Sequence, residues 1–157
     1  MYMNFPTRYT NIINRIENIH PKKYAQTRNH LDGAVTYLSP YLTRGFITLP
    51  QVRDIILKKY SKNDAMKLIQ ELAWREYFQK VYLEKGDKIF DNLRFDQPGA
   101  EVRGKLPESI VNAETGITII DESIRGLYET GYMHNHARMW VSSLVTNVAR
   151  CHFWEPS

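Results

Sequence analysis

The sequence contains a single cysteine, Cys151, among its 157 residues. One thiol cannot form a disulfide within the chain, so a disulfide scaffold is excluded and a reducing cytoplasm is the expected compartment. No apolar run approaches the ~18 residues that cross a membrane, and residues 1–10 lack the apolar core of a signal peptide. We therefore expect a cytoplasmic protein without a membrane partner.

The excess of positive over negative charge is also small. Lysine and arginine number 21 against 17 acidic residues, which leaves a net charge of +4 and a pI near 9.1. This excess permits an anionic partner without requiring one. Hydrophobic residues at 43% and charged residues at 24% are ordinary for a globular chain and exclude wholesale disorder. The length suits one domain, so we expect residues 1–157 to form a single one.

Several sequence signatures of enzymes are missing. The sequence has no P-loop, no GxGxxG and no GxSxG, so neither nucleotide binding on an α/β fold nor serine hydrolysis is indicated. A zinc site built from His134, His136, Cys151 and His152 is poorly supported, because residues two apart on a helix point in different directions. We expect no metal site.

Apolar residues at helical intervals are present throughout. Residues 11–19 carry regularly spaced isoleucines and are predicted to form a helix that Pro21 ends. Thr48 followed by Gln51 resembles a capping box and predicts a helix that continues to about Tyr60.

The longest predicted helix covers residues 64–84, with Ser61 or Asn63 as its cap. Apolar side chains surround most of its circumference, which is typical of a helix at the centre of a bundle. Its sequence also contains Glu71 and Arg75, and charges on a central helix need partners.

Two more helices are predicted near the C-terminus. Residues 118–130 begin with a second apparent capping box, formed by Thr118 and Asp121, and end at Gly131. Residues 134–150 carry an apolar face that consists of Ala137, Trp140, Val141, Leu144, Val145 and Val148.

Two segments, residues 24–48 and 87–112, have no clear periodicity and are predicted to be loops. The second is long enough to suggest a functional role. Because no stretch of convincing length alternates with period two, the sequence predicts an all-α, multi-helix bundle.

One face of the 64–84 helix has an unusual composition. Glu71, Trp74, Arg75 and Phe78 are spaced i, i+3, i+4 and i+7 and therefore share a face. One interpretation is a salt bridge between Glu71 and Arg75 beside a packed tryptophan. The other is a cavity wall that faces a planar, charged ligand.

Two other segments offer hydrogen-bond donors in the same way. Asn135, Arg138 and Met139 lie on the polar face of the last helix, which is either solvated or holds a pyrophosphate or a flavin edge. The hydroxyls of Thr36 and Ser39 suit phosphate, although this segment also reads as a plain turn into a short helix.

Three of these segments together resemble a known family. They are residues 28–42 (RNHLDGAVTYLSPYL), 71–77 (ELAWREY) and 130–139 (TGYMHNHARM). Their sequences, order and spacing resemble the helical FAD-binding domain of the cryptochrome/photolyase family. The matched region extends from about Tyr24 to His152.

The resemblance implies FAD held in a U shape inside an α-helical domain. In family members that repair DNA, a pyrimidine dimer is flipped out of the duplex, and an electron from light-excited reduced flavin splits it. The resemblance assigns the FAD phosphates and adjoining groups to Tyr24, Thr36, Leu38 and Ser39. It assigns the flavin side to Arg75, Asn135 and Arg138.

The same resemblance implies a set of catalytic and DNA-binding residues. Glu71 would hydrogen-bond the flipped bases and Trp74 would pack against the dimer, so both count as catalytic. Arg28 would touch the DNA backbone, which agrees with the net positive charge. The remaining DNA contacts implied by the family are Arg75, Asn135 and Met139.

The sequence also departs from the family pattern. Val35 replaces a threonine of the phosphate loop, and Arg44 stands where an aromatic residue is common. The chain ends at residues 155–157, before the family's Asp-Gly-Asp flavin segment, and it lacks the N-terminal α/β antenna domain. We therefore expect a partial FAD-binding domain, incomplete on its C-terminal side.

Three functional hypotheses follow. The chain is part of a DNA photolyase whose flavin cavity a second chain or a dimer completes. Alternatively, it is a non-catalytic, cryptochrome-like module that binds flavin or DNA. In the third hypothesis it binds no cofactor and acts through protein contacts.

Overall fold

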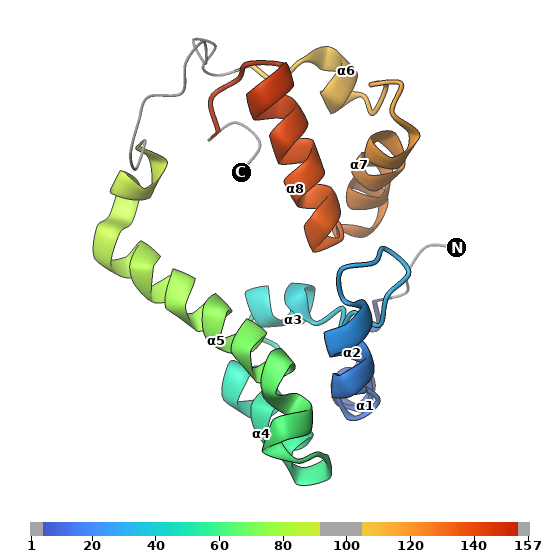
Figure 1. The fold of residues 1–157 in the computed structure, drawn as a ribbon, viewed down its shortest axis with the longest axis vertical. Coiled ribbons are helices and arrows are strands. Elements are labelled where there is room, and N and C mark those ends of the chain that lie inside the picture. The colour runs from blue at the N-terminus through green and yellow to red at the C-terminus, as the bar shows by residue number, and fades with distance from the viewer. Residues whose placement is uncertain (1–4, 92–104, 154–157) are drawn as a thin grey trace. The chain divides into compact units, whose positions relative to one another are not determined.

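A computed structural model of the chain describes residues 5–91 and 105–153. Every element in these ranges is helical, which confirms the predicted all-α class (Figure 1). The chain divides into two compact units, residues 4–86 and residues 87–157 with 1–3. We call them the N-terminal unit and the C-terminal unit and describe each by itself.

The N-terminal unit is built on a long helix with shorter helices packed against it. Helix α5 packs against α2 and α4, and α1 packs against α4 (Figure 1). The core contains fully buried aliphatic side chains from α1 and α4, including Ile12, Ile16, Val52 and Ile56. The helices of this unit are α1 (Tyr9–Glu17), α2 (Pro21–Thr27), α3 (Ser39–Thr43), α4 (Leu49–Lys59) and α5 (Lys62–Lys85).

Side-chain caps begin α4 and α5 where the sequence predicts them. The backbone N–H of Thr48 donates to Gln51 Oε1 at 2.8 Å, and the backbone N–H of Gln51 donates to Thr48 Oγ1 at 3.3 Å. The Ser61 hydroxyl accepts from the backbone N–H of Asp64 at 3.2 Å. Both caps satisfy N–H groups that a helix start leaves without a backbone acceptor.

Three stretches differ from the predicted helix and loop boundaries. Pro21 begins a helix instead of only ending one, because its fixed φ and missing N–H suit the first position of α2. Helix α3 lies inside the segment 24–48, which was predicted to be a loop, at the place where a turn into a short helix was one interpretation. The long loop over 87–112 is likewise interrupted, by a 3₁₀ helix at Gly86–Phe90 and by α6 at Glu108–Val111. Residues 92–104 of that prediction lie outside the described ranges.

Helix α5, whose composition is typical of a helix at the centre of a bundle, is buried over only part of its length. Ala65 and Leu68 are buried, whereas Trp74, Tyr77 and Phe78 are 53%, 53% and 62% exposed. Helix α5 has 24 residues and α4 has 11, so at ~1.5 Å per residue α4 cannot cover it fully. The apolar face of α5 therefore continues beyond the core of its own unit.

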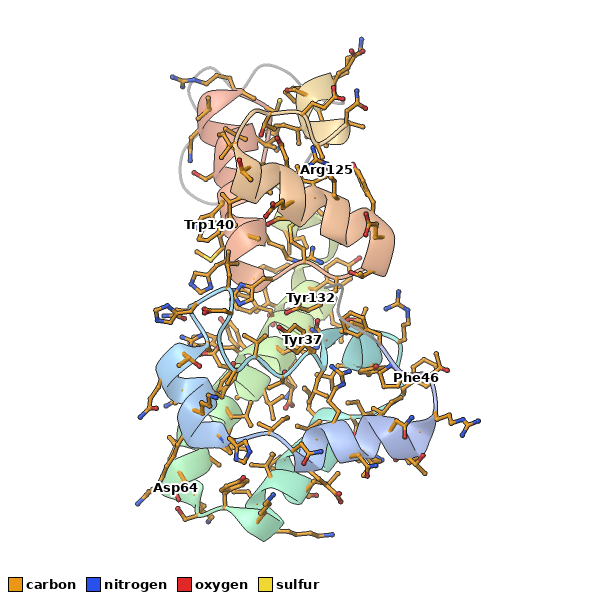
Figure 2. The ribbon with its side chains drawn as sticks, turned by 90° about the vertical axis from the view of Figure 1, so that its right-hand side faces the viewer. Tyr37, Phe46, Asp64, Arg125, Tyr132 and Trp140 are labelled. Carbon is orange, nitrogen blue, oxygen red and sulfur yellow. The ribbon has the colours of Figure 1, made fainter. Side chains whose placement is uncertain are left out.

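The C-terminal unit has a smaller core. Helix α7 (Thr118–Thr130) packs against α6 and against α8 (Asn135–Ser143) (Figure 1). Arg125, labelled in Figure 2, donates from Nη2 to the carbonyl of Ala113 at 2.7 Å. Tyr128 donates its hydroxyl to the carbonyl of Val111 at 2.8 Å. These bonds tie α7 to the end of α6 and the residues after it.

The second apparent capping box does not form. Ile117 is the N-cap of α7, and the buried carboxylate of Asp121 instead accepts hydrogen bonds from the preceding loop. Its donors are the backbone N–H and hydroxyl of Thr115, at 2.9 and 2.6 Å, and the backbone N–H of Gly116, at 3.1 Å. Gly131 ends α7 as predicted, with φ of 71° in the left-handed region.

The last helix is interrupted, whereas the sequence predicts it to be continuous over 134–150. After Ser143 the backbone widens into one π-helical turn, Leu144–Val148, marked by a bond from Ala149 N to Leu144 O at 3.0 Å. The wider turn rotates the residues that follow it. Val148, the last residue of this turn and expected on the apolar face, is 70% exposed.

None of the helices within residues 5–91 and 105–153 is both long and apolar enough to cross a bilayer.

Replacing Asp121 with asparagine should destabilise the C-terminal unit. The three hydrogen bonds, led by that of the Thr115 hydroxyl, hold the pKa of the Asp121 carboxyl below its ordinary value. A lowered folded-state pKa gives stability that is present above the unfolded-state pKa, near 4, and is lost as pH falls through the folded value. Thermal melting from pH 7 to pH 2 should therefore show an acid-dependent loss in the unmodified protein that is smaller in Asp121→Asn. Equal pH profiles for the two proteins would contradict this role.

Candidate functional site

The carboxylate of Glu71 on α5 lies between two cations. Its Oε1 is 3.3 Å from Nη1 of Arg28, at the C-terminal end of α2, and 3.0 Å from Nζ of Lys67, one turn earlier on α5. The side chains of Glu71 and Arg28 are only 29% and 25% exposed. Arg75 instead donates from Nη2 to the Thr43 hydroxyl at 2.7 Å. The i,i+4 partner of Glu71 is thus Lys67 and not Arg75, the partner that the salt-bridge interpretation named.

Tyr24 belongs to the same cluster of side chains. Burial raises the pKa of its phenol, and the negative charge of Glu71 raises it further. The charge of Arg28 and a hydrogen bond from Arg28 act in the opposite direction. The phenol therefore stays protonated at neutral pH and is held beside the ion pair. We call Tyr24, Arg28, Lys67 and Glu71 the Glu71 cluster.

Three aromatic rings stand on α5 just after Glu71. The rings of Trp74 and Phe78 are stacked with centroids 5.9 Å apart and planes inclined by 27°. Tyr77 meets both edge-on, at 5.6 Å from Trp74 and 5.4 Å from Phe78. More than half of each side chain is exposed, so the group offers a preformed aromatic surface to a flat or apolar partner.

The loop between α2 and α3 is fixed to the end of α2. The Thr27 hydroxyl accepts from the backbone N–H of Ala34 at 2.9 Å and donates to the carbonyl of Lys23 at 2.8 Å. A Cβ on Gly33 would lie 1.8 Å from the Thr27 carbonyl oxygen, so only glycine fits this approach. These contacts set the start of the segment that carries Thr36.

The loop residues assigned to phosphate present different groups. Leu38 is buried in the core, and its backbone N–H points to the Thr36 hydroxyl at 3.4 Å. Ser39 is exposed and begins α3. Leu38 can therefore act only through its backbone, whereas Thr36 and Ser39 retain hydroxyls.

In the C-terminal unit, α7 and α8 border a hollow of about 580 Å³. It combines apolar walls with a guanidinium and several hydroxyls. Asn135, on the first turn of α8, donates from Nδ2 to the Met139 sulfur at 3.9 Å. The lining residues are Leu127, Met133, Arg138, Met139, Val141, Ser142, Ser143 and Thr146.

Helix α8 begins with a histidine cap. Nδ1 of His134 accepts from the backbone N–H of His136 at 3.1 Å, which requires that nitrogen to be unprotonated. Burial lowers the pKa of His134, and the neighbouring His136 lowers it further. The neutral imidazole that caps α8 is therefore favoured at neutral pH.

The structure brings together some of the expected site residues. Tyr24, Arg28 and Glu71 meet in the Glu71 cluster, while Arg138 and Met139 line one hollow with Asn135 beside it. Lys67 and Thr43 were missed. The i,i+4 spacing from Lys67 to Glu71 could have identified the first, but no sequence signal connects Thr43 with Arg75. Within the described ranges, no group of three or more acidic, histidine or cysteine side chains is placed to hold a metal.

Each unit, taken by itself, contains side chains of the kinds that FAD binding requires. A pyrophosphate needs cations and hydroxyl donors, and an isoalloxazine ring needs apolar walls with donors at its polar edge. The N-terminal unit supplies the hydroxyls of Thr36 and Ser39 and the guanidinium of Arg75. The C-terminal hollow supplies Arg138 and hydroxyls among apolar walls.

Comparisons with known proteins identify the family. A family model described as "FAD binding domain of DNA photolyase" matches residues 68–156. The chain is 32% identical over 146 residues to cryptochrome DASH of Natronomonas pharaonis, and 30% identical over 131 residues to cryptochrome DASH of Danio rerio. These alignments cover 84% and 78% of this chain. The chain belongs to the photolyase/cryptochrome family, and FAD is the cofactor of the domain it represents.

Solved structures have the same helical fold. A cryptochrome from Synechocystis sp. superposes with a TM-score of 0.79 at 25% identity, covering 98% of this chain and 35% of the other. A class III photolyase from Agrobacterium tumefaciens gives 0.73 at 23% identity, covering 93% and 32%. The predicted likeness to the photolyase/cryptochrome FAD-binding domain is confirmed. The chain spans only 25–30% of the length of the two curated relatives named above.

Replacing Glu71 with glutamine should lower the pKa of Tyr24. The change removes the negative charge that raises this pKa and leaves the burial of the phenol in place. NMR titration of ring-labelled tyrosine would measure the shift. Glu76→Gln is the matched control, because Glu76 lies on the same helix and pairs with Lys80 at 2.7 Å outside the Glu71 cluster. An unchanged Tyr24 titration in Glu71→Gln would refute this coupling.

Proposed function

We propose that this chain is the partial FAD-binding domain of a DNA photolyase and serves light-driven repair of UV-induced pyrimidine dimers. The observation that carries the proposal is the Glu71 cluster beside the exposed aromatic rings of α5. A positioned carboxylate next to an accessible indole suits recognition of a flipped pyrimidine dimer, which presents N–H donors at its edges and apolar faces. The family match supports the flavin part of the proposal.

Flavin binding is assigned to residues of both units. In the N-terminal unit, Tyr24, Thr36, Leu38 and Ser39 would bind the phosphates and adjoining groups. The cationic and amide side chains assigned to the flavin ring are Arg75, Asn135 and Arg138. Their N–H groups can donate to the ring carbonyls and stabilise negative charge on them.

Dimer binding is assigned to the middle of α5. Both ion pairs of Glu71 end on Oε1, so its Oε2 is the atom we assign to the N–H groups of the flipped bases. The half-exposed ring of Trp74 would stack on the dimer. Arg28 would contact a DNA phosphate, and Arg75, Asn135 and Met139 would complete the contacts around the lesion.

When bound, reduced flavin supplies the photoexcited electron that splits the dimer. The chain's residues would position the damaged bases. Glu71 holds the bases through hydrogen bonds, and Lys67 and Arg28 hold the carboxylate of Glu71. Because Arg28 is already placed by this pair, a DNA phosphate meets a guanidinium whose position is fixed in advance.

A second candidate function is protein contact. Beyond the aromatic group, Tyr82 and Leu83 on α5 are 50% and 81% exposed, which extends the apolar surface toward the end of the helix. Contiguous apolar surface of this kind marks interaction sites. A second chain or a dimer that completes the flavin cavity would use it, and so would a non-catalytic, cryptochrome-like module.

The purified protein should take up FAD, and Arg75→Gln should weaken its FAD affinity. Losing one charge-assisted hydrogen bond costs about 1.5–3 kcal/mol, which corresponds to an affinity roughly ten- to a hundredfold lower. Flavin fluorescence titration measures the dissociation constant. Arg53→Gln removes an equal charge from an exposed pair with Asp54 and should leave the affinity unchanged. A protein that binds no FAD at all would overturn the proposed function in favour of the protein-contact role.

If the protein repairs DNA, Glu71→Gln should lose repair while it keeps flavin. The glutamine retains the size of the side chain but loses the acceptor charge and both ion pairs. Illumination of the FAD-loaded protein with dimer-containing oligonucleotides, followed by quantification of intact pyrimidines, measures repair. Glu76→Gln is again the control and should repair normally. Equal loss of flavin and of repair in Glu71→Gln would contradict the assigned role of Glu71.

A further inference from the structure

A second hollow lies within the N-terminal unit. It has a volume of about 650 Å³ and is bordered by α1, the start of α2 and residues 34–37 of the following loop. Tyr37, which lines this hollow, is labelled in Figure 2. Binding sites for small molecules typically measure ~300–1,000 Å³, so the hollow has the size of a nucleotide site rather than of a site for a simple ion.

The lining is rich in amides and cations. One face of α1 presents Asn11, Asn14, Arg15 and Asn18, spaced i, i+3, i+4 and i+7, toward the hollow. Lys23 of α2 adds a second cation. None of the described residues that line the hollow is acidic. An anion would therefore meet positive charge without a competing carboxylate in the lining.

The guanidinium of Arg15 is supported by two aromatic rings. The guanidinium of Arg15 lies 5.6 Å from the centroid of the Phe5 ring and 6.0 Å from that of Tyr41. The Tyr41 hydroxyl donates to the carbonyl of Pro6 at 2.9 Å. These two cation–π contacts restrict the guanidinium, so a ligand would lose less entropy in ordering it.

The loop wall of the hollow carries backbone strain. Tyr37 has φ of 53°, which a bulky residue rarely adopts. Strained positions persist where the surrounding structure determines them, and they gather at ligand clamps. Tyr37 lines the hollow together with residues of α1.

This hollow differs from the flavin site proposed above. Among the residues of the N-terminal unit assigned to FAD or DNA, only Thr36 lines it. Tyr24 follows Lys23 on α2, and successive helical residues point about 100° apart. Lys23 accordingly lines the hollow, whereas the Tyr24 phenol joins the Glu71 cluster.

We propose that this hollow is a second ligand site that binds a nucleotide-type phosphate ester, apart from FAD and from the dimer. Arg15 and Lys23 would bind the phosphate, since a guanidinium matches phosphate oxygens in a bidentate manner. The amides of Asn11, Asn14 and Asn18 each donate and accept hydrogen bonds, as the edge of a nucleobase requires. A free nucleotide and the end of a nucleic-acid strand share this chemistry.

Isothermal titration of the purified protein with adenosine monophosphate (AMP) tests the site. Lys23→Gln should weaken AMP binding about tenfold, because it removes one charge-assisted contact. Lys22→Gln is the matched control, since Lys22 is the adjacent residue of α2, pairs with Asp64 and does not line the hollow. Asn14→Asp places a carboxylate in the hollow and should abolish binding, whereas Asn29→Asp, an exposed change outside it, should not.

Three further measurements separate the alternatives. Inorganic phosphate should bind at least tenfold more weakly than AMP; equal binding would reduce the hollow to a site for simple anions and overturn the proposal. AMP binding that FAD abolishes would make the hollow part of the flavin site and would also overturn it. A single-stranded oligothymidylate that binds more tightly than AMP, with the same variant pattern, would support the site and identify nucleic acid as the source of the phosphate.

The variants must first be shown to be folded, by circular dichroism and thermal melting. Folded Lys22→Gln and Lys23→Gln proteins with equally weakened AMP binding would show diffuse attraction instead of a site. Absence of AMP binding to the folded, unmodified protein would likewise overturn the proposal. It would leave the flavin assignment intact, because FAD uptake is measured separately.

Discussion

The pairing of Glu71 with Arg28 and Lys67 is the interaction on which the candidate site depends. It joins the end of α2 to the middle of α5 through side chains that are partly buried. A partly buried carboxylate is costly unless cations and hydrogen bonds compensate it. Since Arg28 comes from α2, the pair also fixes the point from which the chain departs into the loop that carries Thr36. The carboxylate, the phenol of Tyr24 and the start of that loop are thereby set by one contact.

The length of α5 places the aromatic rings next to this pair. In the first half of the helix Ala65 and Leu68 are buried against the short helices, whereas the aromatic residues of the second half are largely uncovered. Trp74, Tyr77 and Phe78 support one another through ring contacts, so their surface is ordered without a covering partner. A charged, half-buried cluster and an open aromatic surface thus adjoin on one helix. This arrangement suits a ligand that has both polar edges and flat faces.

The parts of the structure that the sequence predicted are those with local causes. The capping box of Thr48 and Gln51 and the glycine stop at Gly131 require only residues within one turn, and both form. Asp121 was misassigned because its carboxylate had two local sets of donors within reach, and the loop donors of Thr115 and Gly116 prevailed over the helix start. The π-helical turn after Ser143 has no comparable signal in the sequence.

The site was predictable in its composition but not in its pairings. Spacing along α5 allowed Glu71 to pair with Lys67 or with Arg75, and both choices satisfy the i,i+4 rule. Two residues from other segments of the fold decide between these pairings. Arg28 pairs with Glu71, and Thr43 accepts a hydrogen bond from Arg75. Contacts between single residues that are far apart in the chain produce no periodic pattern in the sequence, so these pairings could not be predicted from it. The exposure of Trp74 was unpredictable for the same reason, because it depends on the lengths of neighbouring helices.

The distribution of acidic side chains indicates what each region can bind. Among the described residues, the linings of both hollows contain cations, hydroxyls or amides and no carboxylate, although the chain has 17 acidic residues. Donor-rich linings of this kind favour phosphates and other anions. The Glu71 cluster is the contrasting case, since its carboxylate has an oxygen directed to neither ion pair and suits a ligand with N–H donors. FAD carries a pyrophosphate, whereas a pyrimidine pair presents N–H donors at its edges. This difference argues for assigning the two ligands to different groups of side chains.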